Sequence, residues 1–151
     1  MKLSRRKARE ITLCLIFDFG FNSQEKPDEL LDLYLKYYPD ERAENIAEQV
    51  KGDNYIQNVY FGVAEKVDEL DEIIRNCSQK WKLERISRVS VSILRMAIYE
   101  LLYVEGTPHE VTVNEAVEIS KKYDTEESYT FINGVLGAVI TNIVDKRQDN
   151  E

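Results

Sequence analysis

The stretch RVSVSILRMAIYELLY, at positions 88–103, constrains the fold more than any other part of this sequence. Apolar residues cover nearly every side of the helix that it would form, and only a thin polar line through Arg88, Ser92 and Arg95 follows helical spacing. A helix that is apolar almost all round belongs in the middle of a domain. The stretch is too short, and its two arginines too polar, for a bilayer span. We therefore predict a buried central helix, with Gly106 as its stop signal.

The N-terminal half shows amphipathic helices separated by capping and breaking residues. Ser4 is suited to cap a first helix, and Pro27 to open a second one, which ends at Pro39. Residues 39–53 form an acidic connection with room for a short helix. A long apolar stripe at helical spacing predicts a third helix over residues 54–76.

The C-terminal half carries more than one possible helix start. Thr107 and Thr112 each begin a capping box, so the helix that reaches Tyr123 has two candidate origins. Asp124, with an acidic residue three positions later, predicts the start of a last helix that continues to Lys146.

No segment shows sustained alternation of apolar and polar residues, so we assign no strands. The predicted fold is all-α, a compact protein of about six to seven helices in two small helical-bundle halves. The halves span residues 1–77 and 78–146 of one domain, followed by a frayed tail over residues 147–151. Gly134 and Gly137 lie inside the last helix, where we expect them to allow close approach of another helix.

Composition favours a soluble cytoplasmic protein. Of the 151 residues, 43% are hydrophobic, enough for a core, and 32% are charged. The N-terminus lacks the uninterrupted apolar run of a signal peptide. Cys14 and Cys77 have no metal-like spacing, and we interpret them as buried free thiols in a reducing compartment.

Charge is distributed unevenly along the chain. The first ten residues carry a balance of +4, whereas the whole chain has a net charge of −8, so the rest carries −12. Cations at a helix start oppose the helix dipole, which suggests a separate reason for their presence, such as binding a polyanion. Ordinary acidic solubility with a solvated helix start is the alternative.

The sequence offers no catalytic or metal-binding constellation. His109 is the single histidine, and phosphate-binding glycine loops and nucleophile elbows are absent. We therefore predict a binding protein without enzymatic activity, cofactor or metal. Trp81, between Lys80 and Lys82, could stack on a base, but the alternative that it fills the core is favoured.

Three segments in order, ILRMAIYELLY, TPHEVTVNEAVEISKKY and EESYTFINGVLGAV, resemble the C-terminal half of the NusB family of bacterial transcription antitermination factors. The opening SRRKAREITLCLIF resembles the arginine-rich start of the same family. The resemblance implies an all-helical protein without enzymatic activity that binds boxA RNA of nascent ribosomal transcripts together with NusE, a ribosomal protein. The wider partner is the RNA polymerase antitermination complex.

The resemblance also implies site residues. The RNA-binding positions that it assigns are Lys2, Arg5, Arg6 and Arg9. The NusE-binding positions that it assigns are His109, Glu127 and Phe131. His109 stands where the family can have an aromatic hydroxyl, Glu127 could instead complete a helix cap, and Phe131 could instead belong to the core. Arg95 and Glu115 also match the family pattern, and we interpret them as a structural charge pair.

Two other functions remain open from the sequence. The chain could be an RNA-binding domain like the NusB-like extension of ribosomal RNA cytosine methyltransferases, although it contains no glycine-rich cofactor loop. It could also be a helical adaptor that binds only proteins. We expect a monomer or a weak homodimer that does not associate with membranes.

Overall fold

The computed structural model describes residues 2–22, 24–38, 45–78 and 85–149. These residues form helices and contain no strand, which confirms the all-α fold class. The chain divides into two compact units, Met1–Glu65 and Lys66–Glu151. The division lies inside one long helix, at the irregular backbone of Lys66 (φ −109°, ψ 19°), whereas the sequence placed it after residue 77.

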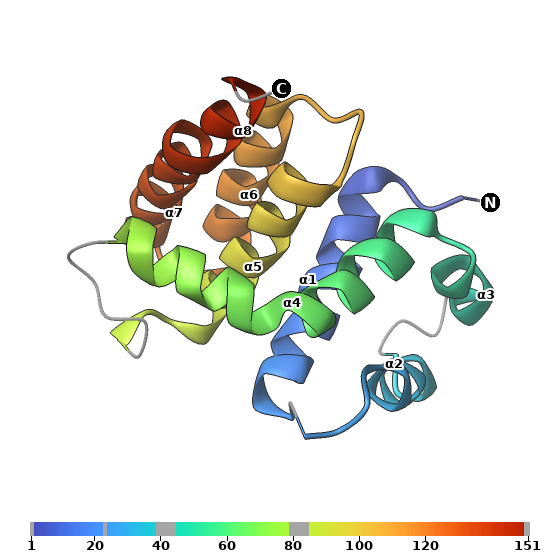
Figure 1. Ribbon diagram of the computed structural model, residues 1–151. Coiled ribbons are helices and arrows are strands. Elements are labelled where there is room, and N and C mark those ends of the chain that lie inside the picture. Colours follow the sequence, from blue (N-terminus) through green and yellow to red (C-terminus); the bar gives the residue numbers. More distant parts are fainter. Residues whose placement is uncertain (1, 23, 39–44, 79–84, 150–151) are drawn as a thin grey trace. The chain divides into compact units, whose positions relative to one another are not determined.

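The first unit contains α1 (Arg5–Phe21), α2 (Pro27–Lys36), α3 (Ile46–Lys51) and the first part of α4 (Asn54–Ser78) (Figure 1). The Ser4 hydroxyl accepts a hydrogen bond from the Lys7 amide at 3.1 Å, so the predicted cap of α1 is confirmed. Pro27 is the first residue of α2, also as predicted. Its carbonyl accepts a hydrogen bond of 2.7 Å from the Tyr60 hydroxyl, which ties the start of α2 to α4.

The second unit contains the rest of α4, then α5 (Arg88–Tyr103), α6 (His109–Tyr123), α7 (Glu126–Val139), the π-helical turn η2 (Ile140–Val144) and α8 (Asp145–Asp149). Helix α5 is buried almost continuously from Ser90 to Leu101, which confirms the predicted central helix. Ser92 on its polar line is buried as well, with 3% exposure, and its hydroxyl donates to the Arg88 carbonyl. Gly106 adopts the expected left-handed conformation (φ 87°) just beyond this helix.

A nearly buried ion pair joins α5 to the second part of α4. The Arg95 guanidinium donates to both carboxylate oxygens of Asp71, each at 2.8 Å, and the two side chains are only 14% and 15% exposed. Such a bidentate pair fixes both direction and distance between two helices. The family resemblance suggests Glu115 of α6 as the partner of Arg95, whereas the structure pairs Arg95 with Asp71 of α4.

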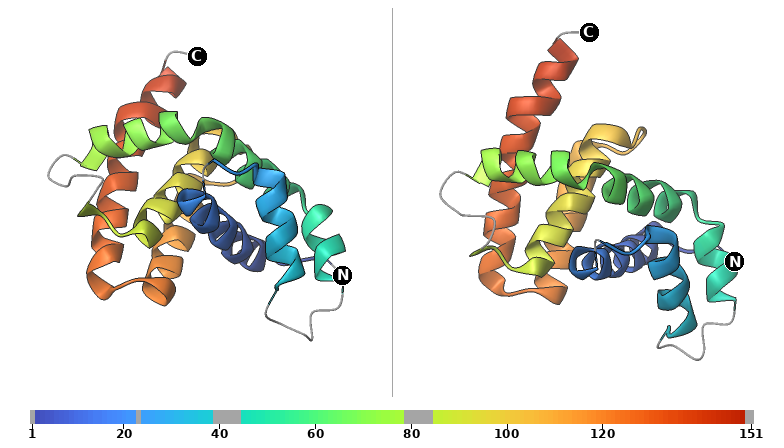
Figure 2. Two further views of the ribbon diagram at one scale, coloured as in Figure 1. Left: turned by 90° about the horizontal axis from the view of Figure 1, so that it is seen from below. Right: turned by 60° about the horizontal axis from the view of Figure 1, so that its bottom comes forward.

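Helices α6 and α7 pack against each other as an antiparallel pair (Figure 2). Helix α6 begins at His109 after Pro108, without a side-chain cap, so neither predicted capping box determines its start. Helix α7 begins at Glu126, and the prediction that Asp124 caps it is wrong, because Asp124 instead ends α6.

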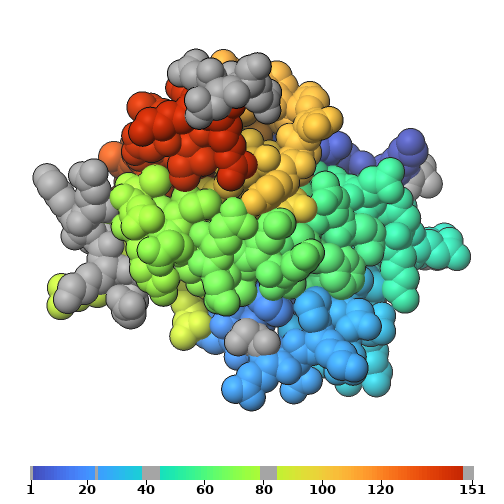
Figure 3. Space-filling view, in the orientation of Figure 1, coloured from blue at the N-terminus to red at the C-terminus, as the bar shows by residue number. Residues whose placement is uncertain are grey.

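The C-terminal helical segment continues through α7, η2 and α8 without leaving helical backbone angles. It therefore reaches Asp149, beyond the predicted end at Lys146. Figure 3 shows this segment (red) against the second part of α4 (yellow-green). Gly134 and Gly137 lie on its exposed side, and a Cβ atom at either position would meet nothing within 4 Å. The prediction that they permit close helix packing is wrong.

The two cysteines are free but only half-buried, so the predicted burial is incomplete. Partial burial raises the pKa of each thiol above its ordinary value. Across the described residues, no helix combines the length and the apolar character that crossing a membrane requires. That part of the chain also lacks any group of three His, Cys, Asp or Glu side chains placed to hold a metal ion.

Candidate nucleic-acid interface

The N-terminal end of α1 presents a group of exposed cations. Lys2, Arg5, Arg6 and Lys7 are all exposed, and the first turn of the helix contains no acidic residue. Each exposed cation at a helix start costs about 0.3–1 kcal/mol against the helix dipole. The same positions, together with the backbone amides of a helix start, attract anions.

Arg9 does not belong to this exposed group. It is only 3% exposed, and its guanidinium lies 5.5 Å from the centroid of the Tyr55 ring in α4. The resemblance assigns Arg9 to RNA binding together with Arg5 and Arg6, but in the structure Arg9 is buried whereas Arg5 and Arg6 are exposed. Position 9 follows Ala8 on the buried side of α1, and the long arginine side chain packs there on an aromatic ring.

Tyr55 is the residue of this region that the sequence did not single out. Its ring is 5% exposed and also receives the guanidinium of Arg5, 4.7 Å from the centroid. Arg5 itself remains exposed, so it contacts the ring and is still accessible to a ligand. Stacking of a guanidinium on an aromatic ring restrains the arginine in a fixed orientation.

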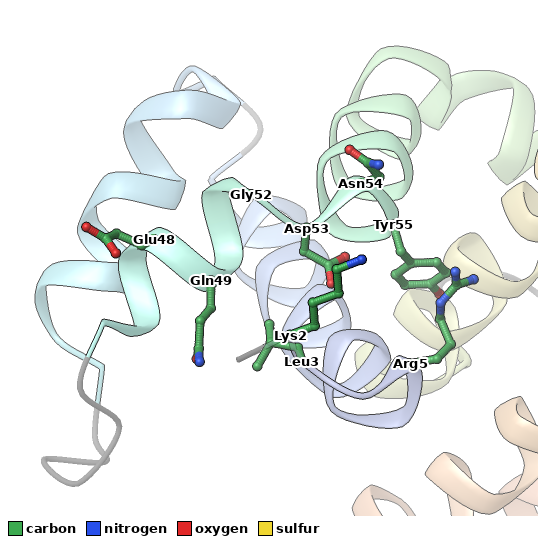
Figure 4. Close-up of a pocket in the computed structure, with 9 residues that line it drawn as sticks. All are labelled: Lys2, Leu3, Arg5, Glu48, Gln49, Gly52, Asp53, Asn54 and Tyr55. Atoms are coloured by element: carbon green, nitrogen blue, oxygen red, sulfur yellow. The ribbon is translucent and has the colours of Figure 1, made fainter.

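A pocket of about 710 Å³ opens beside this stack (Figure 4). We call it the α1–α3–α4 pocket. Its lining comes from the segment at the start of α1, from α3 and from the turn into α4: Lys2, Leu3, Arg5, Glu48, Gln49, Gly52, Asp53, Asn54 and Tyr55. Two cations and two carboxylates balance one another in this lining. The pocket is therefore polar but carries no net formal charge.

Asp53 is held in place at the start of α4. One of its carboxylate oxygens accepts the backbone N–H of Ile56 at 2.9 Å, the arrangement of a helix N-cap. The side-chain amide of Gln57 donates to the Val50 carbonyl at 3.1 Å and closes the turn between α3 and α4. These local bonds give the pocket a rigid wall.

The predicted partner-binding residues do not form one cluster. Glu127 is exposed in the first turn of α7, and Phe131 lies half-buried one turn later. His109 is the first residue of α6, and the 15-residue length of that helix separates it from Glu127 by roughly 20 Å. The structure thus groups Glu127 with Phe131 and leaves His109 at the opposite end of the helix pair.

Exposed aromatic residues flank Glu127. Tyr123 and Tyr129 are 42% and 38% exposed at the turn between α6 and α7, and the Lys121 ammonium lies 5.1 Å from the Tyr129 ring centroid. Exposed aromatic side chains are common at protein interfaces. In the sequence, the position of Tyr123 and Tyr129 near the predicted helix ends is a feature that could have indicated this surface. Trp81, Lys80 and Lys82 lie outside the described residues.

Comparisons with known proteins agree on one family. The family model described as "NusB family" matches residues 6–141. The transcription antitermination protein NusB of Finegoldia magna is 36% identical over 149 residues, covering 98% of either chain. Its counterpart from Clostridium botulinum (strain Hall) is 38% identical over 143 residues, covering 91% of this chain and all of the relative.

A solved structure extends the agreement to the fold. The structure titled "T. maritima NusB, P3121, Form 2" superposes with a TM-score of 0.75 at 33% identity, over the full length of both chains. The helical motifs that suggested the family are thereby confirmed as a full-length similarity in sequence and in structure. Because the family match spans most of the chain and the relatives align almost from end to end, this chain belongs to the NusB family.

Proposed function

We propose that this protein is a transcription antitermination factor that binds boxA-type single-stranded RNA of nascent ribosomal transcripts together with the ribosomal protein NusE. Its relatives carry the name of transcription antitermination proteins. We further propose that the protein is cytoplasmic and has neither catalytic activity nor a cofactor. It joins the RNA polymerase antitermination complex as a monomer or weak homodimer.

The observation that carries the RNA-binding part is the exposed basic start of α1. Lys2, Arg5 and Arg6 present positive charge on a chain whose net charge is −8. A local concentration of cations on an acidic protein favours contact with phosphates there rather than over the whole surface. Arg5 adds a planar group on which a base can stack.

The protein-binding part is assigned to the start of α7. Glu126 and Glu127 place two exposed carboxylates in its first turn, beside exposed Tyr129. A basic ribosomal protein is complementary in charge to such a surface. His109 is a separate candidate contact, because α6 holds it away from Glu127.

A pair of variants with opposite expected effects tests both assignments. The variant Arg5→Ala/Arg6→Ala should weaken boxA RNA binding and lower its salt slope by about 0.7 for each phosphate that is no longer bound, while NusE binding persists. Arg9 is left in place, because its removal would disturb the packing on Tyr55. Glu127→Lys should weaken NusE binding and preserve RNA binding.

Fluorescence anisotropy over a range of salt concentrations measures the affinity of each variant for labelled boxA RNA and for labelled NusE. Lys121→Ala/Lys122→Ala removes the same charge from α6 and serves as the control for RNA. If the arginine variant and Glu127→Lys failed to bind the same ligand, the assignment of two separate surfaces would be wrong. Absence of RNA binding at low salt would instead favour a purely protein-binding adaptor.

A further inference from the structure

We propose that the α1–α3–α4 pocket is a base-reading subsite that selects guanine in the bound RNA, with Asp53 as the group that reads the base. The inference rests on the proposed RNA-binding function and adds a chemical specificity to it. In the view of Figure 4, the side chains of Asp53, Lys2, Arg5 and Tyr55 gather at one end of the pocket, and the Lys2 side chain is drawn between Asp53 and Tyr55.

The charge of the pocket argues for a base rather than a phosphate. Phosphates are attracted by uncompensated cations, whereas the lining of this pocket contains as many carboxylates as cations, with Asp53 at the same end as Lys2 and Arg5 (Figure 4). The exposed side chain of Lys7, outside the lining, is placed for the RNA backbone instead. A polar pocket without net charge, next to a basic surface, suits the uncharged but hydrogen-bonding edge of a base.

The Arg5–Tyr55 stack supplies a surface for the face of that base. Single-stranded RNA is recognised by stacking unpaired bases on aromatic rings or guanidinium planes and by hydrogen bonds to their edges. The Arg5 guanidinium lies 4.7 Å from the centroid of the Tyr55 ring, and the residue is exposed. Because Arg5 and Asp53 line the same pocket, we expect a base stacked on Arg5 to bring its edge to Asp53.

The carboxylate of Asp53 determines which base fits. An ionised carboxylate only accepts hydrogen bonds, and its bond to the Ile56 amide leaves further acceptor sites on both oxygens. The Watson–Crick edge of guanine carries two adjacent donors, N1–H and the 2-amino group. The corresponding edges of adenine, cytosine and uracil each present a single donor group beside at least one acceptor, and a carboxylate repels the acceptor. Guanine is therefore the base that a carboxylate can bind in a bidentate manner.

Replacement of Asp53 by asparagine should change the preference without loss of the fold. Asparagine is as good an N-cap as aspartate, so α4 keeps its start. Its side-chain amide offers one acceptor and one donor, which match the 6-amino group and N1 of adenine. Asp53→Asn should therefore shift the preference from guanine to adenine. Asp68→Asn, an exposed position of α4 outside the pocket, removes the same charge and should leave the preference unchanged.

The experiment measures binding of equal-length oligouridine RNAs with one central guanine, adenine, inosine or no replacement. We expect the wild-type chain to bind the guanine RNA about tenfold more tightly than the adenine RNA, within the range for one bidentate base contact. Inosine lacks the 2-amino group and should bind at an intermediate level. Arg5→Lys keeps the charge but removes the planar stacking surface, so it should weaken binding to every replaced base.

The outcomes separate this inference from the proposed function. If the wild-type chain binds all the RNAs equally, or if Asp53→Asn keeps the guanine preference, the base-reading assignment is overturned while RNA binding stands. If no RNA binds even at low salt, the RNA-binding function fails and the subsite fails with it. A circular dichroism melt of each variant checks that the fold is retained.

Discussion

At the residue scale, Asp124 shows how one carboxylate can join two helices. It follows the last residue of α6 and accepts hydrogen bonds from the Ser87 and Ser90 hydroxyls at the start of α5, at 2.7 and 2.6 Å. Burial by itself would raise the pKa of Asp124, but the bonds from Ser90, Ser87 and the Thr125 amide outweigh it and hold the pKa below the ordinary value of 3.8. The ionised form is thus the one that the folded protein favours.

The lowered pKa of Asp124 predicts a contribution to acid stability. A carboxyl group whose pKa is lower in the folded state than in the unfolded state stabilises the protein. This contribution is fully present at pH values above the unfolded-state pKa, and it disappears as the pH falls through the folded-state pKa. Asp124→Asn should lower the free energy of unfolding by about 1.5–3 kcal/mol near neutral pH, the range for hydrogen bonds to a charged group, and by less in acid.

Urea unfolding of wild type and Asp124→Asn, measured from about pH 3 to about pH 7 so that the range spans the titration of a carboxyl group, tests this effect. Asp68→Asn serves as the matched control at an exposed site. A constant difference in the free energy of unfolding over the whole range would contradict the linkage.

At the scale of elements, α5 carries the core of the second unit. Ile93, Leu94 and Ile98 are fully buried, and α6 and α7 both pack against this helix. Its attachment to the second part of α4 through Arg95 and Asp71 is polar but nearly buried. A helix in this position transmits any loss of volume to several neighbours at once.

Leu94→Ala should therefore lower the free energy of unfolding by about 2–5 kcal/mol, because apolar burial is reduced and a cavity remains. Ser92→Ala is the control in the same helix. Ser92 is also buried, but its hydroxyl bonds locally to the Arg88 carbonyl, so its removal should cost about 1 kcal/mol. Urea denaturation monitored by far-ultraviolet circular dichroism compares the two. Equal stabilities of wild type and Leu94→Ala would show that α5 is not central.

At the scale of the whole molecule, the candidate surfaces fall in different units. The exposed cations and the α1–α3–α4 pocket belong to the first unit, whereas Glu127 and Phe131 belong to the second. The few cations at the start of α1 predict modest RNA affinity for the protein alone. A bound NusE could offer further contacts to the same RNA.

We therefore predict that NusE raises RNA affinity and that RNA raises NusE affinity by the same factor, as linkage requires. A coupling of about 5- to 150-fold corresponds to the usual range of coupling free energies. Isothermal titration calorimetry of RNA into the protein, with and without saturating NusE, measures the factor. Identical RNA affinities in the two titrations would remove the cooperative part of the proposal.

The structural features that could be predicted from the sequence depend either on residues close together in the chain or on motifs shared by the members of the family. The apolar periodicity of α5, the Ser4 cap, Pro27 at the start of α2 and the left-handed Gly106 depend on residues a few positions apart. Such interactions are encoded within one or two turns of chain. The family motifs allow the all-helical fold to be predicted, because the match in residue types and spacing can be recognised from the sequence alone.

Only the tertiary structure decided which distant side chains meet. Arg9 has the charge of a surface residue, yet it is buried because α4 brings Tyr55 against α1. Asp71 became the partner of Arg95 through the packing of two helices, and Gly134 and Gly137 face open space because no helix covers them among the described residues. Burial and pairing depend on contacts between residues far apart in the chain, and helical periodicity carries no information on those distances.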